Sequence, residues 1–199
     1  MEKTYELFNW LINEFGYQSY LEIGCKDNST FDRVKVAKKV GVDPNRGGTL
    51  RMTSDQYFKD HNDTFDLVFV DRLHEHEQAV RDVENSLLRL NQGGTIVMHD
   101  CDPPSEERQR VPQGNQRGWC GDVWKGYLQI RTRPDLDVAC TTFDMGMGII
   151  RVRPNSAILT LPKQAKEMTW ADLEADRAAL LRQFPEEQLL QWIKDPNLI

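Results

Sequence analysis

The sequence predicts a single α/β domain built on a mostly parallel sheet. Short apolar runs alternate with segments of helical periodicity along most of the chain. The runs at 65–71 and 95–99 are apolar at nearly every position, which is typical of strands buried on both faces. Alternating strands and helices form parallel sheets with right-handed crossovers. The 199 residues are enough for one such domain and too few for two of ordinary size.

The first elements follow from periodicity and turn chemistry. Apolar residues at helical spacing predict a helix over 3–15, and Gly16 ends it. A strand is expected at 19–24, followed by a turn, a short helix and a second strand at 39–43. Residues 53–55 are expected to cap a helix that begins at Gln56.

The later elements continue the alternation. After the strand at 65–71, a long helix is expected over about 75–90, ended by Gly93 and Gly94 before the strand at 95–99. Residues 102–121 hold prolines, glycines and charges and predict a long loop that covers a functional site. The remaining expected elements are a helix at 122–131, strands at 138–142 and 147–152, and amphipathic helical stretches at 170–184 and 189–193.

Composition excludes several classes of function. The net charge of -6 lacks the basic field that nucleic acids need, and the short run of Arg108, Arg110 and Arg117 is interpreted as a solvated loop. No apolar stretch approaches the roughly 20 residues of a membrane span, and the acidic N-terminal helix does not resemble a signal peptide. The four cysteines are widely spaced, which favours reduced thiols in a cytoplasmic protein.

Two residues at strand ends indicate a nucleoside site. Gly24 ends the first strand and Asp43 ends the second, 19 residues later. A carboxylate at this spacing can accept both ribose hydroxyls, and a glycine lets a ligand approach the backbone closely. The alternative is that Asp43 is an ordinary turn residue before Pro44.

The turn departs from the dinucleotide fingerprint. Residues 22–30 read EIGCKDNST, so one glycine remains where GxGxxG has three. Glu22 and Asp27 would repel a pyrophosphate. They suit a ligand that carries a cationic amino acid moiety and no phosphate.

Four segments, which include the two strand ends just described, together carry a family resemblance. They are YLEIGCKDNSTF, VGVDP, FDLVFVDRLHEHEQAVRDVENSLLRLNQGGTIVMHDCDPP and WCGDVWKG. Together they resemble the class I S-adenosylmethionine-dependent methyltransferases, in particular a bacterial subgroup of small O-methyltransferases, over roughly residues 18–152. The resemblance implies a Rossmann-like, seven-stranded sheet with an antiparallel last strand, as a domain over 1–153. Residues 154–199 would be a helical extension packed on it.

The resemblance also implies a donor site. Its expected members are Glu22, Gly24, Cys25, Lys26, Asp43, Ser54, Asp55 and Asp71. Glu22 would lie beneath the methionine part, Asp43 would hold the ribose, and Ser54 and Asp55 would lie near the adenine. The chain departs from the family at Asn28 and Arg72, where glycine is usual. Asn tolerates a left-handed backbone, so the turn is expected to survive.

The reaction side needs a group that removes a proton from a hydroxyl acceptor, either a base or a metal. His74, three residues after Asp71, is the first choice for general base, with His99 as a second candidate that could instead be a core residue. His76 is expected to be solvated. By resemblance, Asp71, Asp100 and Asp102 would hold Mg²⁺, and adding an imidazole would favour manganese, iron or zinc. Alternatively these carboxylates bind the donor and cap helices.

These observations predict a methyltransferase that acts on the hydroxyl of a small acceptor, such as a sugar or secondary metabolite. Methylation of nitrogen or a carboxylate, and an inactive donor-binding module, remain alternatives, with a nicotinamide oxidoreductase the least favoured. A homodimer is compatible with the sequence, and no nucleic acid or membrane partner is expected.

Overall fold

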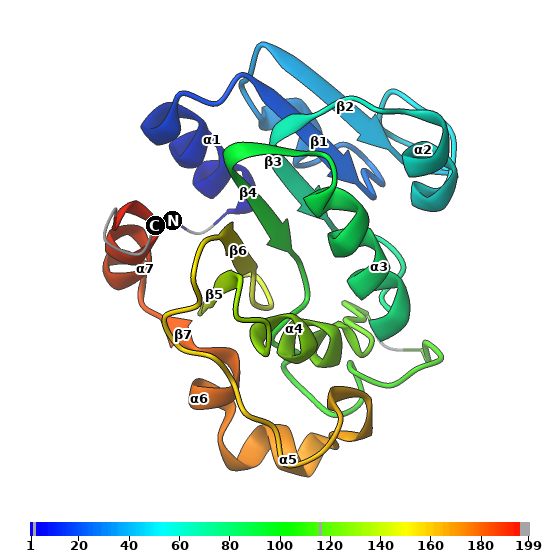
Figure 1. The fold of residues 1–199 in the computed structure, drawn as a ribbon. Coiled ribbons are helices and arrows are strands. Elements are labelled where there is room, and N and C mark those ends of the chain that lie inside the picture. The colour runs from blue at the N-terminus through cyan, green and yellow to red at the C-terminus, as the bar shows by residue number, and fades with distance from the viewer. Residues whose placement is uncertain (2, 116, 196–199) are drawn as a thin grey trace. The chain divides into compact units, whose positions relative to one another are not determined.

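A computed structural model describes residues 1, 3–115 and 117–195. Its strands form one seven-stranded sheet in the order β2-β1-β3-β4-β6-β5-β7 (Figure 1). The strands are β1 (Ser19–Ile23), β2 (Lys38–Val42), β3 (Phe65–Val70), β4 (Leu90–Met98), β5 (Leu136–Thr141), β6 (Gly148–Val152) and β7 (Gln183–Phe184). β1 pairs in parallel with β2 and β3, whereas β5 and β6 are antiparallel. The predicted Rossmann-like α/β fold is confirmed, and β6 is the antiparallel last strand of the expected 1–153 segment.

The helices connect these strands in the expected order. They are α1 (Thr4–Phe15), α2 (Ser54–Asp60), α3 (His76–Leu87), α4 (Val123–Arg131), α5 (Trp170–Ala175), α6 (Arg177–Leu181) and α7 (Glu186–Lys194). Two short 3₁₀ turns cover Phe31–Arg33 and Ala165–Glu167. Gly16 ends α1 in the left-handed conformation, with φ 66°, as its position predicted.

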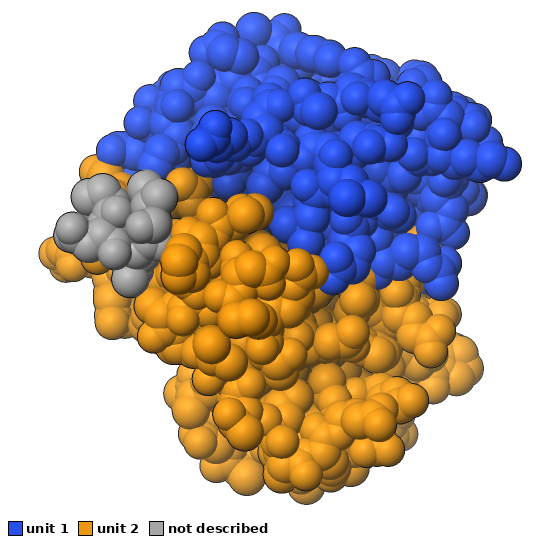
Figure 2. Space-filling view, viewed as in Figure 1, with its two compact units in different colours: residues 1–73, 81–97 blue, residues 74–80, 98–199 orange. Residues whose placement is uncertain are grey.

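The chain divides into two compact units, which Figure 2 colours separately. Unit 1 comprises residues 1–73 and 81–97, and unit 2 comprises residues 74–80 and 98–199. The sequence-based boundary after residue 153 stays a prediction.

Unit 1 has an aromatic and aliphatic core beneath β1. Every residue of β1 is buried, as expected of a strand covered on both faces. Phe8 of α1 packs edge-on against Phe69 of β3 at 4.8 Å between ring centroids, and it also contacts Tyr20. This packing holds α1 against β1 and β3.

Unit 2 is tied together by the fully buried carboxylate of Asp137 on β5. Arg153 Nε lies 3.0 Å from its Oδ2, Arg182 Nη1 lies 2.7 Å from its Oδ1, and Trp192 Nε1 donates to Oδ2 at 2.9 Å. Arg182 and Trp192 belong to the segment after residue 153. That segment is therefore anchored on β5 by a buried, fully paired charge.

Two expectations about element boundaries are wrong. The helix expected over 75–90 ends at Leu87, and β4 begins at Leu90, so Gly93 and Gly94 lie inside a strand. A side chain at Gly94 would come within 2.7 Å of the Asp66 carbonyl oxygen, which explains the glycine there.

The amphipathic stretch at 170–184 is also divided differently from the prediction. It breaks at Asp176 into α5 and α6, and its last two residues form β7, which pairs in parallel with β5. Amphipathic periodicity cannot reveal such a break, because the apolar face continues through it.

Within the described residues, no helix has both the length and the apolar character needed to cross a membrane.

Candidate active site

The turn after β1 requires glycine at position 24. Its φ is 94°, and a Cβ there would lie 1.9 Å from the backbone oxygen of Asp71. The Gly24 N–H donates to the Val42 carbonyl at 2.8 Å, and the Asp71 N–H donates to the Ile23 carbonyl at 2.8 Å. The turn is thus fixed between the ends of β2 and β3, with an open backbone that a ligand can approach.

The rest of the turn keeps its shape without further glycines. Asn28 has a φ of 63°, so the left-handed backbone expected for it is confirmed. Its side-chain oxygen accepts the Gly48 N–H at 2.6 Å, which ties this turn to the loop after β2. The backbone of Lys26 is also left-handed, with a φ of 51°, a conformation that its residue type does not predict.

Asp43 is a buried carboxylate held by backbone donors. It is 4% exposed, and it accepts N–H groups from Lys26 at 3.0 Å, Asn45 at 2.8 Å and Arg46 at 3.0 Å. Burial opposes its ionisation, but these hydrogen bonds outweigh burial and keep the pKa of Asp43 below its usual value. Arg72 Nη1 lies 3.7 Å from Oδ1. The carboxylate is therefore ionised and rigidly placed beside Lys26 of the glycine turn.

Glu22 lies under the same turn in an apolar setting. It is 2% exposed, and the Tyr20 hydroxyl donates to its carboxylate. Burial raises the pKa of Glu22 to about 8, although the Tyr20 hydrogen bond acts in the opposite direction. Cys25 points inward, and burial raises the pKa of its thiol. Only the backbone of Cys25 is thus available to a ligand.

Ser54 and Asp55 begin α2, where Thr53 caps the helix by accepting the Gln56 N–H at 3.2 Å. Ser54 is buried, whereas the Asp55 side chain is half exposed and pairs with Arg81 at 3.3 Å. The expected role of Ser54 and Asp55 near the adenine stays a prediction.

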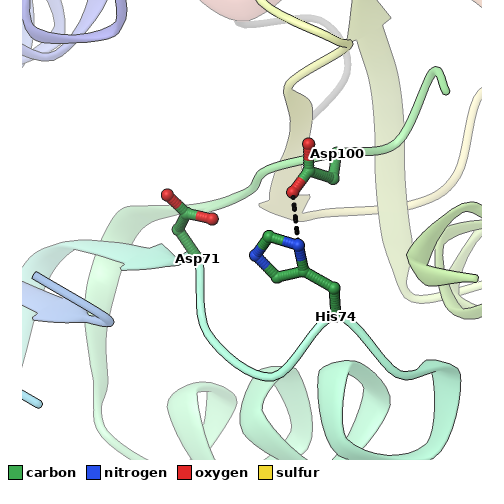
Figure 3. Close-up of side chains that lie close together, drawn as sticks. All are labelled: Asp71, His74 and Asp100. Atoms are coloured by element: carbon green, nitrogen blue, oxygen red, sulfur yellow. Dashed lines mark ion pairs between the residues drawn. The ribbon is translucent and has the colours of Figure 1, made fainter. Parts of the chain in front are cut away.

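In unit 2, His74 is held by two acceptors on the same ring nitrogen. Its Nδ1 lies 2.7 Å from the Trp119 carbonyl oxygen and 3.2 Å from Asp100 Oδ2, and the dashed line in Figure 3 marks the second contact. The indole of Trp119 stacks on the imidazole, with 5.3 Å between centroids and 27° between planes. Sequence analysis selected His74 and Asp100, and the structure brings them together.

Asp100 follows β4 in a strained backbone conformation. It is 1% exposed and has a φ of 61°, which is uncommon for a residue other than glycine. Its Oδ1 lies 3.4 Å from His99 Nδ1, and His99 Nε2 lies 3.6 Å from Asp144. His99 is therefore mostly enclosed and flanked by carboxylates, which agrees better with a supporting role than with direct contact with an acceptor.

Asp102 does not join this group. Arg177 donates to its Oδ1, and Gln183 Nε2 donates to its Oδ2 at 2.7 Å, so both oxygens are bound by the segment after residue 153. The metal set expected from sequence included Asp102 because it follows the same strand as Asp100. A side chain two residues further on is drawn to a different partner.

Asp71 ends β3 in unit 1, and its backbone is fixed by Ile23 and Gly24. His76, the other histidine of this segment, begins α3. Its Nε2 forms a hydrogen bond with Gln129 Oε1 at 3.0 Å. It takes no part in the His74 contacts.

The two tryptophans near the long loop differ in their surroundings. Trp124 in α4 is fully buried and is a core residue. The sequence did not reveal that the Trp119 backbone would contact His74, because a carbonyl group leaves no trace in residue type. Asp144 was missed for a similar reason, since it comes from a turn between β5 and β6.

The fold agrees with the comparisons with known proteins. Residues 19–101 match the sequence profile of a family described as a methyltransferase domain. Among proteins with curated descriptions, none matches this chain.

Several solved structures share the fold. An O-methyltransferase from Bacillus cereus in complex with SAH is 14% identical, with a TM-score of 0.55, over 75% of this chain and 80% of its own. The O-methyltransferase TomG from Streptomyces achromogenes, in complex with SAM, is 15% identical, with a TM-score of 0.54, over 74% and 78%. An SAH-bound methyltransferase from Podospora anserina is 15% identical, with a TM-score of 0.54, over 77% and 80%.

The chain therefore shares its Rossmann-like fold with these solved methyltransferases, and residues 19–101 are similar to a methyltransferase domain.

Proposed function

We propose that this protein transfers a methyl group from S-adenosylmethionine to a hydroxyl oxygen of a small acceptor. The observation that carries the proposal is the pairing of the open Gly24 turn with the buried, ionised carboxylate of Asp43. The similar structures with SAH or SAM bound support the choice of donor.

The residues of unit 1 fit such a donor. Asp43 offers a fixed acceptor for ribose hydroxyls, and the Gly24 and Cys25 backbone leaves room for the methionine part. Glu22 beneath the turn would lose its proton when a cationic group approaches, since a nearby positive charge favours the carboxylate. The acidic side chain of Asp27 and the absence of a second turn glycine speak against a pyrophosphate and hence against a nicotinamide cofactor.

When bound, the donor supplies an activated methyl group, so the protein's main tasks are alignment of the acceptor and removal of its proton. His74 is the proposed general base, supported by the Asp100 carboxylate at 3.2 Å. A positioned base of this kind contributes about 10²–10⁴-fold to the rate.

A divalent cation is a second way to activate the hydroxyl. Within unit 2, Asp100 and His74 offer a carboxylate and an imidazole, and an imidazole ligand favours manganese, iron or zinc over magnesium. Because Nδ1 of His74 faces two acceptors, a cation would have to bind Nε2, the nitrogen that would otherwise act as base. His74 therefore serves as a base or as a ligand, not as both at once.

A methyl-transfer assay tests this proposal. The purified protein is incubated with S-adenosylmethionine and a panel of sugars, phenols, amines and carboxylic acids, with and without a metal chelator, and products are identified by mass spectrometry. Methyl ethers support the proposal, and retained activity with the chelator identifies His74 as base. Products confined to amines or esters would replace it with nitrogen or carboxyl methylation. Donor binding without any product would favour an inactive binding module.

A sugar or secondary metabolite is the proposed acceptor class, and the assay panel is built around it. A homodimer stays a prediction, to be checked by light scattering of the purified protein.

A further inference from the structure

The long loop before α4 makes its closest contact with His74 through backbone atoms. The Trp119 carbonyl oxygen lies 2.7 Å from His74 Nδ1. A side chain on Gly121 would come within 1.6 Å of the His74 carbonyl oxygen, so only glycine permits this approach. The loop backbone therefore lies close to both the imidazole and the backbone carbonyl of His74.

This segment of the loop is itself held in place. The Cys120 and Gly121 N–H groups donate to the Arg108 carbonyl at 2.9 and 3.0 Å. Trp119 Nε1 donates to the Arg110 carbonyl at 2.6 Å. These three hydrogen bonds therefore fix the position and orientation of the Trp119 carbonyl within the protein itself.

The second acceptor at Nδ1 is equally constrained. Asp100 is buried, its backbone is left-handed, and its other oxygen lies 3.4 Å from His99. Neither a carbonyl oxygen nor an ionised carboxylate can donate a hydrogen bond. A neutral imidazole with two acceptors at one nitrogen carries its proton on that nitrogen.

We infer that the Trp119 carbonyl and Asp100 hold neutral His74 in the tautomer protonated on Nδ1, which makes residues 119–121 a positioning element for Nε2. The tautomer itself follows from the contacts alone. Its catalytic meaning rests on the proposed function, because Nε2 is then the nitrogen presented to the acceptor hydroxyl.

Stacking adds to the same effect. The Trp119 indole lies nearly parallel to the imidazole, at 5.3 Å between centroids, and limits rotation of the ring about its χ2 bond. A ring flipped by 180° about this bond would put Cδ2 where Nδ1 lies and lose both acceptors. The loop thus favours one orientation as well as one tautomer.

Nitrogen-15 NMR of the imidazole side chains measures the tautomer directly. The spectrum is recorded on the whole protein with chelator and without donor, at a pH where His74 is neutral, and the His74→Gln variant assigns its signals. The wild-type protein is expected to show the proton on Nδ1. A wild-type spectrum with the proton mainly on Nε2 overturns the inference.

Two variants test which groups hold the tautomer. Asp100→Asn keeps a residue that tolerates the left-handed backbone, and Trp119→Ala removes the stacking ring. Asp100→Asn is expected to raise the fraction of the other tautomer and to slow methyl transfer at least tenfold with unchanged affinity for S-adenosylhomocysteine. Trp119→Ala keeps the backbone carbonyl, so it is expected to loosen the ring orientation and leave the proton on Nδ1. Asp144→Asn is the matched control: it alters a carboxylate beside His99 and leaves the His74 signals as in wild type. Unchanged His74 signals in Asp100→Asn would contradict the assignment to Asp100.

The outcome is separable from the proposed function. Normal donor affinity with the wrong tautomer refutes only the positioning role of the loop. The expected tautomer without any donor affinity refutes only the methyltransferase proposal for this site.

Discussion

The candidate functional residues of the two units are held by different kinds of contact. In unit 1, the donor turn consists mainly of backbone, and its two carboxylates are held by N–H groups or a hydroxyl close in sequence. In unit 2, His74 depends on side chains and carbonyls from 26 and 45 residues away. The first kind of site is encoded locally, while the second exists only after a long loop has folded. Variants in the two units should therefore fail in different ways.

The largest effect is expected from Gly24→Ala in unit 1. The new methyl group would overlap the Asp71 carbonyl at 1.9 Å, so the turn must move and affinity for S-adenosylhomocysteine should fall below detection by calorimetry. Gly93→Ala is the matched control. Gly93 also has a positive φ, of 77°, but nothing lies within 4 Å of a Cβ there. It should cost about 1 kcal/mol of unfolding free energy and leave donor affinity unchanged. Equal donor affinity in both variants would contradict a role of the Gly24 turn in donor binding.

His74→Gln in unit 2 should fail in the opposite way. Loss of the base should reduce kcat of methyl transfer by about 10²–10⁴-fold, with the donor dissociation constant unchanged. His76→Gln serves as the control, since His76 contacts Gln129 and not the His74 group. If donor affinity fell together with kcat, the separation between the two parts of the site would be disproved.

Asp43→Asn should weaken donor binding to an intermediate extent. A hydrogen bond to a charged group is worth about 1.5–3 kcal/mol, so we expect roughly a 10- to 100-fold loss in affinity for S-adenosylhomocysteine. Asp63→Asn, which breaks an exposed ion pair with Lys38, should change nothing in the same titration. An unaltered affinity in Asp43→Asn would show that the Asp43 carboxylate does not bind the ribose.

The smallest effect concerns the pH dependence contributed by Glu22. Its folded pKa of about 8 lies above the ordinary value of 4.5, so the folded protein holds an extra proton between these values. The free energy of unfolding contributed by Glu22 is therefore greatest below pH 4.5 and declines as pH rises toward 8. Glu22→Gln should remove this decline. Denaturant melts of both proteins across this range check it, and parallel curves would show that Glu22 is ionised in the fold.

The difference between contacts close in sequence and contacts from distant residues explains which features could be predicted from the sequence. The strand ends, Gly24, Asp43 and the left-handed Asn28 follow from local spacing and backbone preference, and the structure agrees with each placement. His74 and Asp100 were selected because they follow strands. Asp102 satisfied the same rule, yet Arg177 and Gln183 bind it, and neither lies near it in sequence. The Trp119 carbonyl could not be predicted because backbone groups are identical in every residue.

The central claim is that the Gly24 turn and Asp43 together hold the donor. A crystal structure of the protein with S-adenosylhomocysteine tests it most directly. The account predicts both ribose hydroxyls within hydrogen-bonding distance of the Asp43 carboxylate, with the amino acid moiety over the Gly24 backbone. A nucleoside bound elsewhere, or a ribose that does not touch Asp43, would contradict it.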